Sequence, residues 1–181
     1  MSPLLPVPRV LTVLACLVAA GSGLVQAQSP LAQIVSDPQG RFAMAFPAAW
    51  EVATRADGVI VLVARGPEQS GPRPTVNVAV EPLPEPMTPA AYAARAERLV
   101  AFTFHNYTVV QQGSATIAGR SAYYRYFTWE PNDAPPVYQL QAYFTSGRLG
   151  FVVTGSTANE ADSVRRDMPA IVQILDTFRV L

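Results

Sequence analysis

The sequence predicts an α+β domain in which a mostly antiparallel β-sheet is flanked by helices. Short apolar stretches with strand-like alternation follow one another through tight glycine-containing turns, which favours antiparallel pairing. Two other stretches have apolar residues three or four positions apart, as amphipathic helices do. The 154 residues that follow position 27 of the 181-residue chain suit one domain.

Residues 1–27 have the features of a bacterial export signal. Arg9 supplies a positive charge, residues 10–20 form an apolar stretch, and Val25-Gln26-Ala27 is a small-residue cleavage site. A retained membrane anchor is the alternative, but a spanning helix needs about 20 continuous apolar residues, and Arg9 and Gly21-Ser22-Gly23 shorten this stretch. We therefore expect a periplasmic or secreted protein with no integral membrane span after cleavage.

Cys16 raises the alternative of a lipoprotein. Val13-Leu14-Ala15-Cys16 loosely resembles the box in which a cysteine is acylated, but the apolar stretch continues past this cysteine. We therefore interpret Cys16 as an apolar residue of the signal core. No cysteine follows residue 27, so no disulfide is expected in the exported chain.

The first half of the exported chain is expected to form strands after a short linker over residues 28–36, with a single domain over residues 37–181. Asp57-Gly58 is a strong hairpin signal. The continuously apolar residues 59–64 are typical of a strand covered on both faces. The strands predicted here are 41–46, 50–54, 59–64 and 75–81.

A first helix is predicted from Thr88-Pro89 to about Phe104, since threonine favours the N-cap and proline the first helical position. Helical spacing assigns its inward side to Tyr92, Ala96, Leu99, Val100 and Thr103. Its solvent side is expected to carry Arg95, Glu97 and Arg98.

Four strands and a second helix are predicted in the second half. Thr157 is a candidate N-cap of the closing helix, and Pro169 is expected to kink or split it. The expected strands are 108–117, 120–130, 137–145 and 148–154. The apolar side of the helix is assigned to Ala161, Val164, Met168, Ile171, Leu175 and Phe178.

Composition excludes several function classes. All 13 basic residues are arginine, and without lysine neither a phosphate-binding loop nor Schiff-base chemistry is available. Removal of Arg9 leaves a net charge near −1, which argues against a nucleic-acid partner. The one histidine, His105, is interpreted as a surface residue, and neither a metal nor a cofactor is expected.

Paired carboxylates remain a possible source of hydrolytic chemistry. Glycosidic cleavage uses two of them at a set separation, and four carboxylates flank predicted loops. The sequence does not give the distances between them, and most carboxylates of the chain are expected to be solvating charges. The four are Glu81, Glu85, Glu130 and Asp133.

Strand periodicity divides residues 121–129 and 137–145 into two faces. The face assigned to the core carries Ala122, Tyr124, Tyr126, Thr128, Tyr138, Leu140, Ala142 and Phe144. The opposite face mixes aromatic rings with an arginine and two amides, and such side chains are enriched where partners dock. The alternative is that a helix covers this face too. The candidate binding residues are Tyr123, Arg125, Trp129, Gln139, Gln141 and Tyr143, with Phe127 between them.

Three motifs lie in order along the chain: residues 40–47 with Trp50 just beyond, the Ile117-Ala118-Gly119-Arg120 step into Ala122-Tyr123-Tyr124, and residues 171–179. Through them residues 37–181 resemble the family of PsbP, Mog1 and the DcrB/DUF1795 group of exported bacterial proteins. The resemblance implies an α/β/α sandwich and a compact, non-enzymatic accessory domain.

The sequence therefore predicts an exported, non-catalytic accessory protein that binds a protein or a cell-envelope component. Two alternatives stay open. One is a small-molecule carrier with a pocket between sheet and helix, and the other is an exported hydrolase that uses two loop carboxylates.

Overall fold

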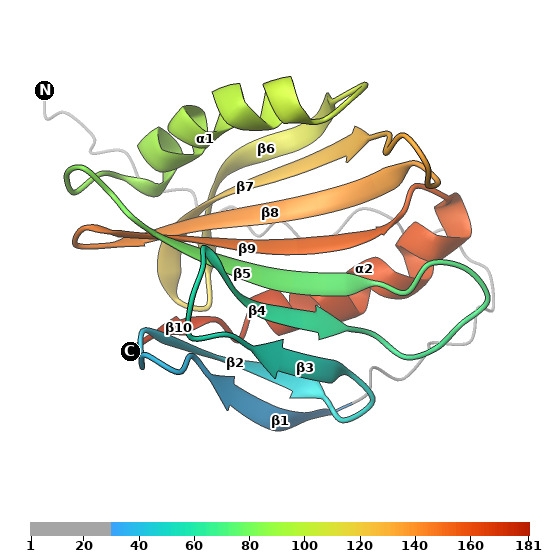
Figure 1. Ribbon diagram of the computed structural model, residues 1–181, viewed down its shortest axis with the longest axis horizontal. Helices are drawn as coiled ribbons and strands as arrows, with labels where there is room; N and C mark the ends of the chain where they lie inside the picture. Colours follow the sequence, from blue (N-terminus) through green and yellow to red (C-terminus); the bar gives the residue numbers. More distant parts are fainter. Residues whose placement is uncertain (1–29) are drawn as a thin grey trace, which may run out of the picture.

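The structure is a computed structural model that describes residues 30–181. The predicted export signal, its cleavage site and Cys16 lie outside these residues. Strands and helices follow the predicted order, with one additional strand at each end (Figure 1). The elements are β1 (Leu31–Ser36), β2 (Phe42–Pro47), β3 (Glu51–Thr54), β4 (Ile60–Arg65), β5 (Thr75–Pro82), α1 (Pro89–Thr103), β6 (Thr108–Ile117), β7 (Arg120–Trp129), β8 (Val137–Ser146), β9 (Leu149–Ala158), α2 (Ala161–Leu175) and β10 (Arg179–Val180).

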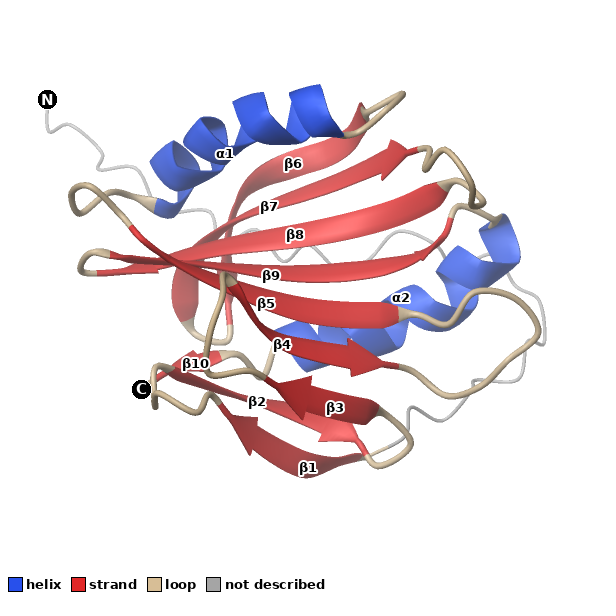
Figure 2. Ribbon diagram, in the orientation of Figure 1, coloured by secondary structure: helices blue, strands red, loops and turns tan. Residues whose placement is uncertain are grey.

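Two antiparallel sheets and two helices form an α+β fold, as predicted (Figure 2). The large sheet has the strand order β3-β4-β5-β9-β8-β7-β6, and the small sheet has the order β1-β2-β10. Tyr92 of α1 packs against Gly150, and Ile171 of α2 packs against Gly155. Residues 150 and 155 of one strand face opposite ways, so the helices lie on opposite faces of the large sheet. We call these the α1 face and the α2 face.

The main core lies between the α2 face, α2 and the small sheet. Phe178 stacks on Phe42 at 5.5 Å and on Phe144 at 4.6 Å between ring centroids. A Cβ atom at position 155 would lie 2.1 Å from Cγ2 of Ile171, so only glycine allows α2 to approach β9 this closely. The core residues predicted on β7 and β8 pack here: Ala122, Leu140, Ala142 and Phe144 are buried, and Tyr124, Tyr126 and Tyr138 lie against them.

The first helix begins where the sequence predicts. Thr88 is the N-cap, and its hydroxyl accepts the Ala91 N–H at 3.2 Å. Three assignments of its sides are wrong. Leu99, which is 70% exposed, and Thr103 lie on the solvent side, while Glu97 turns toward the sheet and pairs with Arg125. A buried guanidinium needs a partner, and this pairing sets the rotation of the helix.

The linker predicted over residues 28–36 is wrong for residues 31–36, which form β1 and pair with β2. The inward position 33 is a glutamine, so the apolar alternation is interrupted. Its amide donates to the carbonyl oxygens of Pro47 at 3.0 Å and Trp50 at 2.8 Å. These two hydrogen bonds satisfy the Gln33 amide. The interrupted alternation at this residue is the reason that the sequence pattern predicts a linker here.

Thr157 does not cap α2. It belongs to β9, and α2 begins three residues after β9 ends, with Glu160 at the N-cap position. Pro169 lies inside α2 on an exposed side without splitting the helix. Residues 59–64 are not covered on both faces throughout, since Val59 and Ile60 are exposed at the end of β4 next to the hairpin turn.

Candidate functional site

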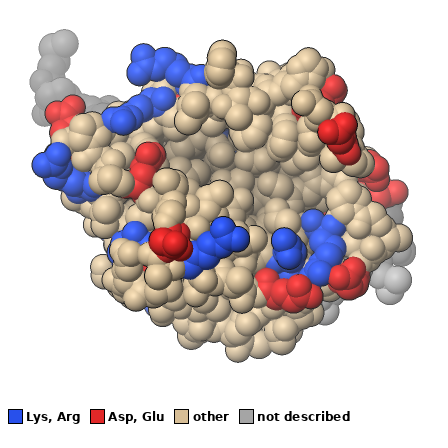
Figure 3. Space-filling view, viewed as in Figure 1, with Lys and Arg blue, Asp and Glu red and all other residues tan. Residues whose placement is uncertain are grey.

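The α1 face is only partly covered. Helix α1 packs mainly on β7 and β8, and through Tyr92 it reaches Gly150 at the start of β9 and Glu81 at the end of β5. Within residues 30–181 no helix covers the rest of β9, β5 and β4 on this face (Figure 1). Figure 3 shows this uncovered part as a hollow in the middle of the molecule, with charged side chains around its margin and none on its floor. We call this concave part of the α1 face the hollow.

One row of paired residues crosses both parts of the α1 face. Directly opposite residues of antiparallel strands point to the same side of a sheet. The pairs Gln112–Arg125, Arg125–Gln141, Gln141–Thr154 and Thr154–Asn77 therefore place five polar side chains in line. The row begins beneath α1 and ends in the hollow.

Arg125 is the centre of the covered part and is only 1% exposed. Its Nη2 donates to Oε2 of Glu97 at 2.9 Å, and its Nε donates to Oε1 of Gln112 at 2.9 Å. The rings of Tyr123 and Tyr143 lie 5.9 and 5.8 Å from the guanidinium carbon, within the range of cation–π contacts. A buried cation thus joins α1 to the sheet.

Two tyrosine hydroxyls near Arg125 are buried deeply enough to affect their ionisation. Burial raises the pKa of the Tyr143 hydroxyl and of the Tyr107 hydroxyl, and the opposing effect of the Arg125 charge is smaller. The Tyr143 hydroxyl donates to Oε1 of Gln141. Among the described residues the Tyr107 hydroxyl and Nη1 of Arg125 have no hydrogen-bond partner.

Trp129 lies at the carboxyl-terminal end of α1. Its ring centroid is 4.5 Å from that of Phe104, the C-cap residue of the helix. Its Nε1–H donates to Oε1 of Gln139 at 3.0 Å. The side chain is half-buried, so part of the indole stays accessible at the border between helix and sheet.

The floor of the hollow is uncharged and combines polar residues with apolar ones, since Val63 pairs with Asn77, and Ala79 with Val152, on the same face. Besides Thr154 and Asn77, the floor includes Ser156 and Thr75. Ser156 of β9 pairs with Thr75 of β5 on one side and with Gln139 of β8 on the other. The oxygens of Gln139 and Gln141 accept bonds from Trp129 and Tyr143, so the amide N–H groups of both glutamines are directed elsewhere. Hydroxyls and amides of this kind can hydrogen-bond a ligand, but they supply neither a nucleophile activated by a base nor a proton-transfer pair.

The structure divides the six predicted binding residues. Helix α1 covers Arg125 and Tyr143, which are buried, and Tyr123 is half-buried beside them. The alternative interpretation, in which a helix covers this face, is therefore correct for Arg125, Tyr143 and Tyr123. Helix α1 lies over them and supplies Glu97 as the partner of the buried Arg125 cation. Gln139 and Gln141 lie at the border of the hollow and are also buried, while Trp129 is half-buried there. Contact of any of the six with a partner stays a prediction.

Several residues of the site were missed from the sequence. Asn77 and Thr154 belong to predicted strands, while Ser156 lies beyond residue 154, where the second of these strands is predicted to end. Their positions on a shared floor follow only from the strand register. Glu97 has an ordinary solvent-side spacing on α1. Only the buried arginine 28 residues away reveals its role.

The four loop carboxylates do not gather at one place. Glu81 accepts the Tyr92 hydroxyl at 2.6 Å near the start of α1, where Glu85 also precedes the helix. Glu130 accepts the Asn106 amide at 2.7 Å beyond the end of α1, close in sequence to Asp133. The two pairs are thus separated by a helix of 15 residues, about 22 Å long. Across residues 30–181 no group of three His, Cys, Asp or Glu could hold a metal ion.

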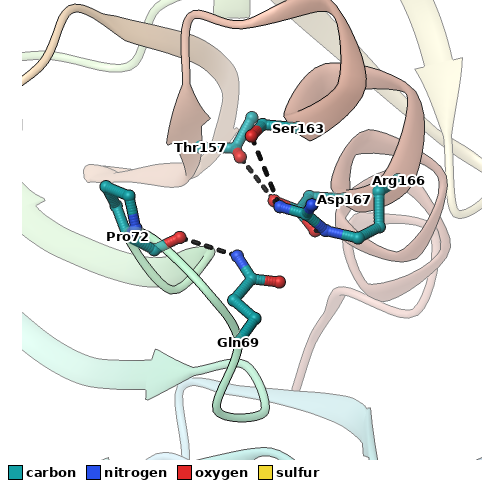
Figure 4. A network of polar contacts seen from close by, with 6 residues as sticks. All are labelled: Gln69, Pro72, Thr157, Ser163, Arg166 and Asp167. Atoms are coloured by element: carbon teal, nitrogen blue, oxygen red, sulfur yellow. Dashed lines mark hydrogen bonds and ion pairs between the residues drawn. The ribbon is translucent and has the colours of Figure 1, made fainter.

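A second polar cluster joins β9 to α2 (Figure 4). The buried carboxylate of Asp167 accepts the Thr157 hydroxyl at 2.6 Å and Nε of Arg166 at 2.9 Å. Nη2 of Arg166 also lies 3.4 Å from the Ser163 hydroxyl. Asp167 thus has a cation and a hydroxyl as partners, and the cluster anchors the first turns of α2.

The family model of DcrB matches residues 43–175. A search of curated proteins finds no match to the sequence. Among the helices of the described residues, none has the length and apolar character needed to cross a membrane.

Three solved structures have a similar fold. Cyanobacterial PsbP (CyanoP) of Synechocystis has a TM-score of 0.62 at 16% identity, covering 90% of this chain and 98% of CyanoP. LpqN of Mycobacterium tuberculosis, described as involved in cell envelope biogenesis, has a TM-score of 0.60 at 17% identity, with coverages of 82% and 89%. The Ran-binding protein Mog1p of Saccharomyces cerevisiae has a TM-score of 0.57 at 10% identity, with coverages of 83% and 96%.

Proposed function

Because this chain belongs to the DcrB family, whose fold it shares with CyanoP, LpqN and Mog1p, we propose that it is an exported, non-catalytic accessory protein. Its role is to bind a protein or a cell-envelope component. Fold alone does not determine function, so the proposal depends on the site. The observation that carries it is the hollow, a concave uncharged surface on the part of the α1 face that neither helix covers within residues 30–181 (Figures 1 and 3).

The chemistry of the hollow supports binding rather than catalysis. Its floor offers hydroxyls and amides from Asn77, Thr154 and Ser156, and the indole of Trp129 lies at its border. Sites that bind without reacting combine apolar or aromatic contact area with a few placed polar groups. The loop carboxylates, which a hydrolase of the predicted kind needs close together, lie at opposite ends of α1.

A photoreactive residue placed at position 156 tests the binding proposal in cells. We expect it to form a specific adduct with the partner, and we expect Asn77→Arg to abolish this adduct because the longer charged side chain fills the hollow. A photoreactive residue at Thr116, exposed on β6, is the matched control. Equal adducts from positions 156 and 116, or an adduct that Asn77→Arg leaves unchanged, would contradict the proposal.

A small-molecule carrier is the second candidate, and the concavity of the same uncharged floor favours it. Native mass spectrometry of the purified protein distinguishes the two. A carrier retains a bound mass that Asn77→Arg removes and Thr116→Arg does not. A protein partner instead gives only the crosslinked adduct.

A further inference from the structure

The solvent side of α1 carries two arginines and two large apolar residues in one stripe. Arg95, Arg98, Leu99 and Phe102 follow the spacing i, i+3, i+4 and i+7, which places them on the same side of a helix. Leu99 is 70% exposed and Phe102 is 89% exposed. Packing against the sheet explains neither of them, because α1 uses its other side for that purpose.

The stripe is also locally cationic. Glu97 is the only acidic residue of α1, and it is turned inward to Arg125. The ion pairs formed within residues 30–181 do not include Arg95 or Arg98. The whole chain has a formal net charge of zero, so this concentration of positive charge is a property of the surface. Figure 3 shows basic side chains along the edge formed by α1.

We propose that α1 docks on an anionic phospholipid surface through Arg95, Arg98, Leu99 and Phe102. Arginines beside exposed leucine and phenylalanine are the composition of helices that lie in the membrane interface. The guanidinium groups bind headgroup phosphates, and the two apolar side chains insert below them. A convex helix edge without a groove fits a planar lipid surface better than a folded partner. The inference goes beyond the proposed function, since the stripe lies outside the hollow.

Co-sedimentation of the purified protein with vesicles tests the proposal. We expect binding to vesicles that contain phosphatidylglycerol, weaker binding at high salt, and little binding to pure phosphatidylcholine. The double variant Arg95→Glu/Arg98→Glu should lower the bound-to-free ratio at least tenfold, because one arginine near an anionic surface contributes roughly fivefold. Phe102→Ser should weaken binding at both salt concentrations.

The matched control reverses two exposed charges elsewhere. Arg55→Glu/Arg120→Glu changes the net charge by the same amount, away from α1, and should keep most of the binding. All variants have the same amino-terminal segment, so any contribution of that segment to vesicle binding is the same in each of them. Equal losses in the two double variants would overturn the proposal, because binding would then follow net charge alone. Absence of binding to phosphatidylglycerol vesicles would overturn it directly.

Tryptophan fluorescence gives a second readout. Phe102→Trp should shift its emission to shorter wavelength with phosphatidylglycerol vesicles, whereas Val59→Trp, also at an exposed position, should not. Asn77→Arg should leave vesicle binding unchanged, and Phe102→Ser should leave the adduct from position 156 unchanged. Failure of one proposal therefore stays distinguishable from failure of the other. Loss of a protein adduct in Phe102→Ser, with no vesicle binding by the parent protein, would identify a protein interface instead.

Discussion

The two helices have the same length of 15 residues and are attached in opposite ways. α2 buries an apolar side made of Met168, Ile171, Ile174 and Leu175. α1 buries only Tyr92 and Ala93, in a small apolar cluster with Leu83 and Tyr143. Polar contacts add to this attachment, namely Glu97 with Arg125 and the Tyr92 hydroxyl with Glu81.

This difference separates a structural helix from an adaptable one. Burial of apolar area is the main stabilising term in folding and does not require any side chain to be ionised. A polar attachment depends on the charge state of its members. The attachment of α1 also leaves apolar residues of this helix exposed. One side of α1 therefore packs on the sheet, while the other side is accessible to a binding partner.

The largest expected effect is on the attachment of α2. Ile171→Ala should lower the free energy of unfolding by about 2–5 kcal/mol, because it leaves a cavity beside Gly155. Urea unfolding measures this. Arg165→Ala on the exposed side of α2 is the control and should have little effect. If Ile171→Ala lowers the free energy of unfolding no more than Arg165→Ala does, the apolar side of α2 is not what attaches this helix.

The next effect is on the attachment of α1. Glu97→Gln should cost about 2 kcal/mol, because it leaves the buried Arg125 charge without its counterion. This value lies below the usual cost of breaking a buried pair, since the Glu97 side chain is 38% exposed. Hydrogen exchange should show the amides of α1 losing protection before those of α2.

The double variant Glu97→Gln/Arg125→Met sharpens this test. It removes the buried cation as well, so it should recover part of the stability lost in Glu97→Gln. Equal stability of the single and double variants would mean that the pair does not hold α1.

A smaller effect concerns alkaline pH. Burial and the hydrogen bond to Glu81 raise the pKa of the Tyr92 hydroxyl. A raised pKa means that the folded state keeps its proton longer than the unfolded state, so this stability is present below pH ~10 and is lost as pH rises above it. Tyr92→Phe should cost about 1 kcal/mol at neutral pH, and its stability should fall less steeply above pH ~10. An unchanged slope in denaturation measured across this range would contradict the role of Tyr92.

The smallest effect is expected at the exposed stripe of α1. Leu99→Ser and Phe102→Ser should change the free energy of unfolding by less than about 0.5 kcal/mol. Thermal unfolding measures this. A loss above about 1 kcal/mol would show that these side chains pack inside the fold after all.

Much of the fold follows from local signals. Thr88 with Pro89 predicts the start of α1, and Asp57 with Gly58 predicts the hairpin between β3 and β4. The failures have a common cause in contacts distant along the chain. Periodicity assigns Glu97 to solvent because Arg125, its partner, lies in another element.

The candidate site was less predictable than the fold. Alternation in β7 and β8 separates the two faces correctly, and it therefore finds Gln139 and Gln141. The hollow itself depends on the register of β5 and β9, which places Asn77 beside Thr154. It also depends on α1 leaving most of those strands uncovered (Figure 1), and neither property is encoded in a local pattern.

The position of Phe178 constrains how the protein can be made. Its ring completes the cluster of Phe42, Phe144 and Phe151, residues that are up to 136 positions earlier in the chain. The aromatic cluster therefore cannot be completed while residue 178 is still inside the ribosome.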